Sequence, residues 1–210
     1  NPAAALQSLE KAMALCPDEQ GWKMSYIATL NDLERPEEAL EALHSFAKTS
    51  ALNPEYFFQE ARALLDAYKA SQAVLSYRKS LLLAPSSPQA LNNLQLAERR
   101  VGRMQDAVRN ASRACLIEPE NIELQHGLTD ALLSAGEIER GHARNFWRHL
   151  KPEIQIIRHG LPKEWDGAPC GDGAGLLVCH EQGIGDELRF VSCIPDIQKR
   201  FNGPVFLESD

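Results

Sequence analysis

The stretch NNLQLAERRVGRMQDAVRNASRACLIEPEN, residues 92–121, carries a pattern that recurs every 34 residues along the first 150 positions. One position of the pattern holds a small residue: Ala5, Ala39, Ala73, Ala107 and Gly141. Four residues later come Leu9, Leu43, Tyr77, Ala111 and Asn145. Twelve residues after the small residue come Pro17, Ala51, Pro85, Pro119 and Glu153, and five residues before it come Glu34, Tyr68, Gly102 and Gly136. Several positions recurring in step indicate an internal repeat.

A period of 34 residues is typical of a unit made of two antiparallel helices and two short turns. The small residue is expected where the second helix crosses closest to the first, so Ala73 and Ala107 are predicted to be buried. Proline ends the second helix, because it cannot continue the helical hydrogen bonding. Gly102 and Gly136 are expected in the turn inside a unit, where a positive φ favours glycine.

Residues 92–121, together with GLTDALLSAGEIERG at 127–141, resemble the tetratricopeptide repeat (TPR) family in their leucine, alanine, glycine and proline positions. The resemblance implies an α-solenoid over residues 1–152, with four complete helix pairs after an unpaired first helix. We therefore expect the natural protein to extend further at its N-terminus. The expected helices span residues 20–33, 36–53, 54–68, 71–84, 103–118, 122–135 and 137–150, with a further helix that starts at Pro88.

The composition is that of an ordinary globular protein with 44% hydrophobic and 24% charged residues. The net charge of −7 argues against a general nucleic-acid surface, which needs clustered Lys and Arg. No apolar run is long enough to span a membrane, and the N-terminus is typical of an amphipathic helix rather than a signal peptide. We expect a cytoplasmic protein.

The five cysteines are odd in number and widely spaced. Neither a disulfide framework nor a metal site is expected, and the histidines lack metal-ligand spacing. The cysteines are predicted to be small buried apolar residues in a reducing compartment.

Residues 153–174 are rich in glycine and proline and are predicted to be a linker. Residues 175–210 then predict the first βαβ fragment of an α/β domain. Its strands are expected at 175–179 and 205–208, with a helix from Asp186 that Pro195 kinks or restarts. Gly183-Ile-Gly185-Asp186 lies between the first strand and the helix, where backbone N–H groups favour an anion. The alternative is a tight turn with Asp186 capping the helix.

The string LPKEWDGAPCGDGAGLLVCHEQGIGDELRFVSCIPDI, residues 161–197, resembles the junction in bacterial proteins where TPR units precede a GT-B, heptosyltransferase-like glycosyltransferase domain. The resemblance implies a ligand loop of Glu181, Gln182, Gly183 and Gly185, with Asp186 as general base toward an acceptor hydroxyl. It also implies a longer parent protein, of which this chain is a part, that uses a nucleotide-sugar donor. Because the donor-binding half is absent, this chain is expected to hold no cofactor and to be inactive. Ser192 stands where arginine is common, which leaves the subfamily open.

The TPR resemblance also implies a protein or peptide partner on the concave face, which the first helix of each unit lines. In this register the face carries Met24, Ala28, Asn31, Phe58, Arg62, Asn92, Leu96, Arg99, His126 and Asp130. Arg62, Arg99 and Asn92 could hold a carboxylate of an acidic segment. The alternative is an ordinary solvated helix face.

Three functions follow from these patterns. The first is recognition of a protein or peptide by the repeats. The second is a glycosyltransferase whose repeats select the acceptor, and the third is a structural scaffold. The incomplete α/β fragment could also self-associate, since its strand edges lack partners.

Overall fold

The computed structural model describes residues 2–17, 19–46, 53–150, 165, 167–168, 173–178 and 191–208. The chain divides into two compact units, residues 1–154 and 155–210, and each is described by itself. No helix in the described ranges is long and apolar enough to cross a membrane.

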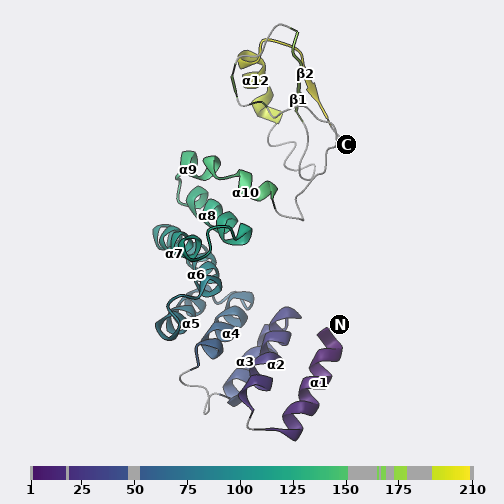
Figure 1. The fold of residues 1–210 in the computed structure, drawn as a ribbon, viewed down its shortest axis with the longest axis vertical. Helices are drawn as coiled ribbons and strands as arrows, with labels where there is room; N and C mark the ends of the chain where they lie inside the picture. The colour runs from purple at the N-terminus through teal and green to yellow at the C-terminus, as the bar shows by residue number, and fades with distance from the viewer. Residues whose placement is uncertain are drawn as a thin grey trace. The chain divides into compact units, whose positions relative to one another are not determined.

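The first unit is a series of helices that stack in chain order (Figure 1). They are α1 (Pro2–Leu15), α2 (Gln20–Asp32), α3 (Pro36–Phe46), α4 (Pro54–Asp66), α5 (Ala70–Leu83), α6 (Pro88–Arg100), α7 (Met104–Ile117), α8 (Ile122–Ser134), α9 (Ile138–Ala143) and α10 (Phe146–His149). Each helix from α1 to α8 packs against the next helix along the chain. The described residues up to 150 contain no strand. The predicted first helix and four following pairs are confirmed.

Local sequence explains where several helices begin. The side chains of Asn53, Ser87 and Asn121 accept hydrogen bonds from backbone N–H groups in the first turns of α4, α6 and α8. Pro54 and Pro88 occupy the first turn, where a helix has no use for the missing N–H. Each cap satisfies donors that the helix itself leaves unpaired.

Most predicted helix boundaries agree with the structure to within two residues, and two predicted helices differ more. The second helix of the first complete pair was expected over 36–53, but α3 ends at Phe46 and residues 47–52 lie outside the described residues. The last helix, expected over 137–150, is divided into α9 and α10. At the division, the N–H groups of Arg144 and Trp147 donate to carbonyls three residues earlier, those of Gly141 and Arg144. These tight turns replace the regular helical bonds and end α9 early.

The recurring turn position has the same left-handed backbone in all four helix pairs. The φ angles are 56° at Glu34, 59° at Tyr68, 79° at Gly102 and 79° at Gly136. The expectation for the two glycines is confirmed. In the first two units a residue with a Cβ adopts the same strained conformation, which indicates that the tertiary fold requires this turn geometry.

The small residues at the helix crossings are buried, as predicted. Ala39, Ala73 and Ala107 have no exposed surface. Gly141 takes the same place in the last unit, where an added Cβ would lie 2.7 Å from Leu133 Cγ. An alanine at the crossing between α8 and α9 would therefore require the Leu133 side chain to shift.

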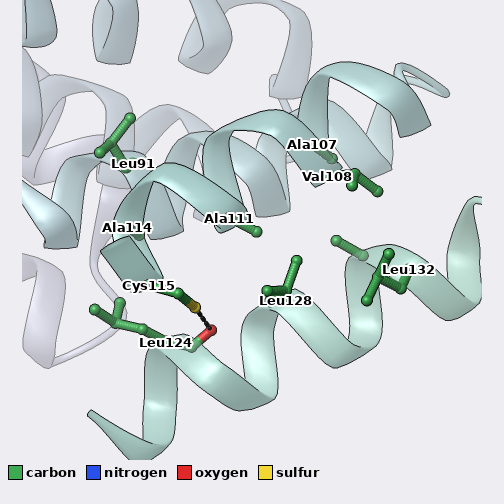
Figure 2. Close-up of a cluster of buried hydrophobic side chains, with 10 residues drawn as sticks. Leu91, Ala107, Val108, Ala111, Ala114, Cys115, Leu124, Leu128 and Leu132 are labelled. Carbon is green, nitrogen blue, oxygen red and sulfur yellow. Dashed lines mark hydrogen bonds between the residues drawn. The ribbon is translucent and has the colours of Figure 1, made fainter. Parts of the chain in front are cut away.

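The core of the repeats consists of three apolar clusters, one of which joins α6, α7 and α8 (Figure 2). It contains Leu91, Ala107, Val108, Ala111, Ala114, Cys115, Leu124, Leu128, Ala131 and Leu132. The Cys115 thiol donates to the Leu124 carbonyl at 3.2 Å. The prediction of buried cysteines holds for Cys115 and is wrong for Cys16 and Cys193, which are exposed. Cys16 follows the last turn of α1, where no neighbouring helix covers it.

The second unit contains a two-stranded parallel sheet of β1 (Leu176–Val178) and β2 (Val205–Leu207). Both strands lie within the ranges predicted for them. A 3₁₀ turn η2 (Val191–Cys193) and helix α12 (Ile194–Arg200) precede β2. Pro195 lies in the first turn of α12, so the helix begins there. The Trp165 ring contacts Phe201 edge-on, with centroids 5.4 Å apart.

Candidate protein-binding face of the repeats

The predicted partner-binding residues belong to α2, α4, α6 and α8, the first helices of the four units. We call the surface formed by their side chains the first-helix face. α2 packs against α4, and α6 against α8, while α4 and α6 also contact each other. Side chains from adjacent first helices therefore meet across these contacts.

Arg62 links α4 to α2. Its Nη2 lies 2.8 Å from Asp32 Oδ1, and the Arg62 side chain remains 29% exposed. A guanidinium carries five N–H donors, and this contact uses one of them. Arg62 therefore keeps donors for a second carboxylate.

Arg99 links α6 to α8 in the same way. Its Nη1 lies 3.4 Å from Asp130 Oδ2, and its Nε donates to Ser134 Oγ at 3.1 Å. The other oxygen of Asp130 lies 3.8 Å from His126 Nε2. The Arg99 side chain is 24% exposed. The structure thus brings three of the predicted residues together in one polar cluster.

Asn92 lies against α8 near this cluster. Its side chain faces Gly127, where an added Cβ would lie 3.5 Å from Asn92 Cγ and 3.2 Å from Gln95 Nε2. Asn92 Oδ1 accepts a long hydrogen bond from Gln95 Nε2 at 3.5 Å. Gly127 therefore allows α6 and α8 to approach closely where Asn92 lies.

Other predicted face residues have a partly structural role. Phe58 is half-buried, and its ring contacts that of Tyr77 edge-on at 5.8 Å. Met24 and Asn31 are buried. Asn31 Nδ2 donates to Gln59 Oε1 at 2.8 Å and to the Gln59 carbonyl at 3.1 Å, which ties α2 to α4. The Asn31 contacts thus hold α2 against α4, and the Phe58 contact holds α4 against α5.

Sequence reasoning missed Asp32 and Ser134, which position the two arginines. For Asp32 the available signal is a spacing that the predicted pair Arg99 and Asp130 shares, whereas Ser134, 35 residues after Arg99, does not follow it. Arg62 follows Asp32 by 30 residues, and Asp130 follows Arg99 by 31 residues. Each separation is about one helical turn shorter than the 34-residue repeat, so the later residue lies one turn before the position equivalent to its partner.

The predicted ligand loop, Glu181 to Gly185, and the predicted general base Asp186 lie outside the described residues. The structure neither supports nor contradicts their roles.

No protein-family model matches this chain. It is 26% identical to Protein FlbA of Caulobacter vibrioides over 198 residues, which are 91% of this chain and 33% of FlbA. The chain thus spans about a third of the length of that curated relative.

Solved structures of similar fold include two that illustrate the likeness. One is TTC0263, a thermophilic TPR protein of Thermus thermophilus, with a TM-score of 0.63 and 16% identity over 72% of this chain and 84% of that one. The other is MamA from Desulfovibrio magneticus RS-1, with a TM-score of 0.61 and 15% identity over 74% of this chain and 88% of that one. The first compact unit, residues 1–154, has a TPR fold. At these identities the likeness concerns the fold alone, and it extends to neither partner nor activity.

Proposed function

We propose that the repeats recognise an acidic segment of a protein partner on the first-helix face. The observation that carries this proposal is the placement of Arg62 and Arg99. Each guanidinium is held across two adjacent first helices by an internal carboxylate and stays about one quarter exposed. A peptide carboxylate would bind the remaining N–H donors in a fork geometry.

The internal ion pairs do not prevent such binding. Partly exposed pairs contribute about 0–1 kcal/mol each, because water competes for both charges. An incoming carboxylate can therefore share or displace Asp32 and Asp130. The pairs restrict the rotamers of both arginines, so the arginines lose less side-chain entropy when a ligand binds.

The test is peptide binding to charge-reversed proteins. Peptides are selected from a random library on the 210-residue protein, and their dissociation constants are measured at several salt concentrations. Arg62→Glu and Arg99→Glu should each weaken the acidic binders by about tenfold and reduce the salt dependence. Arg140→Glu is the matched control, since Arg140 also pairs with a carboxylate, that of Glu137, but lies on a second helix. Equal affinities for the unsubstituted protein and its three variants would show that the peptides do not bind the first-helix face.

A glycosyltransferase parent is the second candidate. The observation in its favour is the parallel pairing of β1 and β2 with α12 between them, the connection found in α/β domains. In this proposal Asp186 is the general base, Glu181 to Gly185 border the acceptor, and a nucleotide sugar is the donor. The natural full-length protein should then transfer sugar to a protein acceptor, and Asp186→Asn should abolish transfer while peptide binding persists. Absence of transfer from any nucleotide sugar would reject this candidate.

The second unit also supports a self-association proposal. Leu177 and Phe206, which are paired across the sheet, both remain largely exposed. A second copy could cover this apolar surface. If so, sedimentation should show a dimer that Phe206→Ser converts to a monomer. If the unsubstituted 210-residue protein is a monomer, the proposal is contradicted.

A further inference from the structure

A cavity of about 580 Å³ lies among α5, α6 and α7, apart from the first-helix face. Arg78, Leu81 and Leu82 of α5 form one wall, and Asp106, Arg109 and Arg113 of α7 belong to the other. Leu94 and Glu98 of α6 line the space between them. The volume falls in the range of ordinary ligand sites, about 300–1,000 Å³. We call this cavity the α5–α7 groove.

The α5–α7 groove and the first-helix face use different sides of α6. Leu94 and Glu98 are four residues apart and share one side of the helix. Asn92, Leu96 and Arg99 follow the same rule on another side. The two α6 surfaces can therefore be altered separately.

A fully buried carboxylate organises the groove. Glu98 has no exposed surface, and its Oε1 accepts a hydrogen bond from Arg78 Nη2 at 2.9 Å. Its Oε2 accepts another from Asn110 Nδ2 at 2.8 Å. One side chain thus joins α5, α6 and α7, and both of its oxygens are occupied. Arg78 and Asn110 are held in place before any ligand arrives.

The charge that remains accessible in the groove is positive. Three arginines line it against two carboxylates, Glu98 and Asp106. Asp106 forms an ion pair with Arg109 and lies 3.6 Å from Arg78. Arg113 donates only to the neutral Asn110 Oδ1, at 3.4 Å. Among the described residues, no carboxylate lies within ion-pair distance of Arg113. A basic site of this kind in a chain of net charge −7 favours an acidic ligand.

Apolar side chains adjoin these charges without being covered. Leu82, in the wall of the groove, is 81% exposed. Leu116 lies three residues after Arg113 on α7 and is 80% exposed. Covering an exposed leucine removes apolar surface from water, so a ligand with an apolar group beside its negative charge should bind more tightly than a simple anion.

We propose that the α5–α7 groove is a second docking site, which binds an acidic protein segment. The segment places a carboxylate on Arg113 and an apolar side chain against Leu82. Charge complementarity with Arg113 and the uncovered leucine select this occupant. The same repeats then hold two partner segments at once, one on each side of α6.

The experiment uses a random peptide library selected on the 210-residue protein, with counter-selection on Arg113→Glu. Arg113 has no carboxylate partner among the described residues, so this substitution breaks no ion pair there. We expect the recovered peptides to combine Asp or Glu with Leu or an aromatic residue, and to bind Arg113→Glu at least about tenfold more weakly. Leu82→Ser should weaken them as well. Arg103→Glu, an equal charge change on the exposed residue before α7, and Arg99→Glu on the first-helix face should leave their affinity unchanged.

Several outcomes would overturn the proposal. If no peptide distinguishes the parent from both Arg113→Glu and Leu82→Ser, the groove is not a docking site. Competition by millimolar inorganic phosphate equal to that by the peptides would indicate a simple anion site. A dimer of the parent protein that Arg113→Glu dissociates would identify a second copy of this chain as the occupant. Circular dichroism of each variant, compared with the parent, excludes unfolding as the cause of lost binding.

Discussion

Tyr68 offers a direct test of the strain in the repeat turns. Its φ of 59° is left-handed, whereas the equivalent positions in the last two units hold glycine. For a residue with a Cβ this conformation costs about 1–2 kcal/mol. The Tyr68 side chain is 92% exposed, so removing it sacrifices almost no buried surface.

Tyr68→Gly should therefore stabilise the protein. Relief of about 1–2 kcal/mol is partly offset by the greater freedom of glycine in the unfolded chain, about 0.4–1 kcal/mol. The two ranges leave a net gain of about 0–1.6 kcal/mol, and its central value of about 0.8 kcal/mol corresponds to a melting temperature higher by roughly 2–3 °C for a chain of this size. Thermal and urea unfolding followed by circular dichroism measure both quantities.

Two further variants separate backbone strain from loss of the aromatic ring. Tyr68→Ala removes the ring but keeps the Cβ, so its stability should stay within about 0.5 kcal/mol of the parent. Gly102→Ala makes the reverse change where an added Cβ meets no atom within 4 Å, and should destabilise the protein by about 1 kcal/mol. If Tyr68→Gly is no more stable than Tyr68→Ala, strain at this turn does not limit stability.

Three more predictions follow from the contacts of single residues. Gly141→Ala should lower the free energy of unfolding by about 1–3 kcal/mol in urea titrations, because the new Cβ overlaps Leu133; an unchanged midpoint would contradict the close crossing. Glu98→Gln should lower it by about 1–3 kcal/mol, since the buried site loses a charge-assisted bond, and an equal or higher stability would show that the pair is not stabilising. Burial raises the pKa of the Cys115 thiol, which leaves little thiolate near neutral pH, so maleimide should label exposed Cys16 far faster than Cys115 until the protein is unfolded. Equal labelling rates in the folded protein would refute the burial of Cys115.

The sequence pattern predicted the repeats more completely than it predicted the candidate sites. The pattern placed Arg62, Arg99, His126 and Asp130 on first helices, and in the structure Arg99, His126 and Asp130 lie together. It did not indicate that an internal carboxylate already pairs with each arginine. Such pairs join residues 30 and 31 positions apart, and their formation depends on helix crossing geometry and on rotamers that no local pattern specifies.

Glu98 illustrates the same limit more strongly. In the sequence it is one of several charged residues near the end of a helix, where exposure is the ordinary expectation. Only the packing of α5 and α7 over α6 buries it and supplies Arg78 and Asn110 as partners. The α5–α7 groove exists because three helices meet there, so no single stretch of the chain predicts it.

The sequence by itself determined the repeat, the burial of the small residues at its crossings and most helix starts. The helix starts arise from hydrogen bonds that act within a few residues, such as the caps at Asn53 and Asn121, and the small residues mark the crossings because they recur at every repeat. The tertiary structure alone decided the division of the last helix, the exposure of Cys16, the ion pairs across the first helices and the burial of Glu98. Each of these depends on which side chains neighbouring helices bring within reach, and that is set by the packing of the whole repeat array.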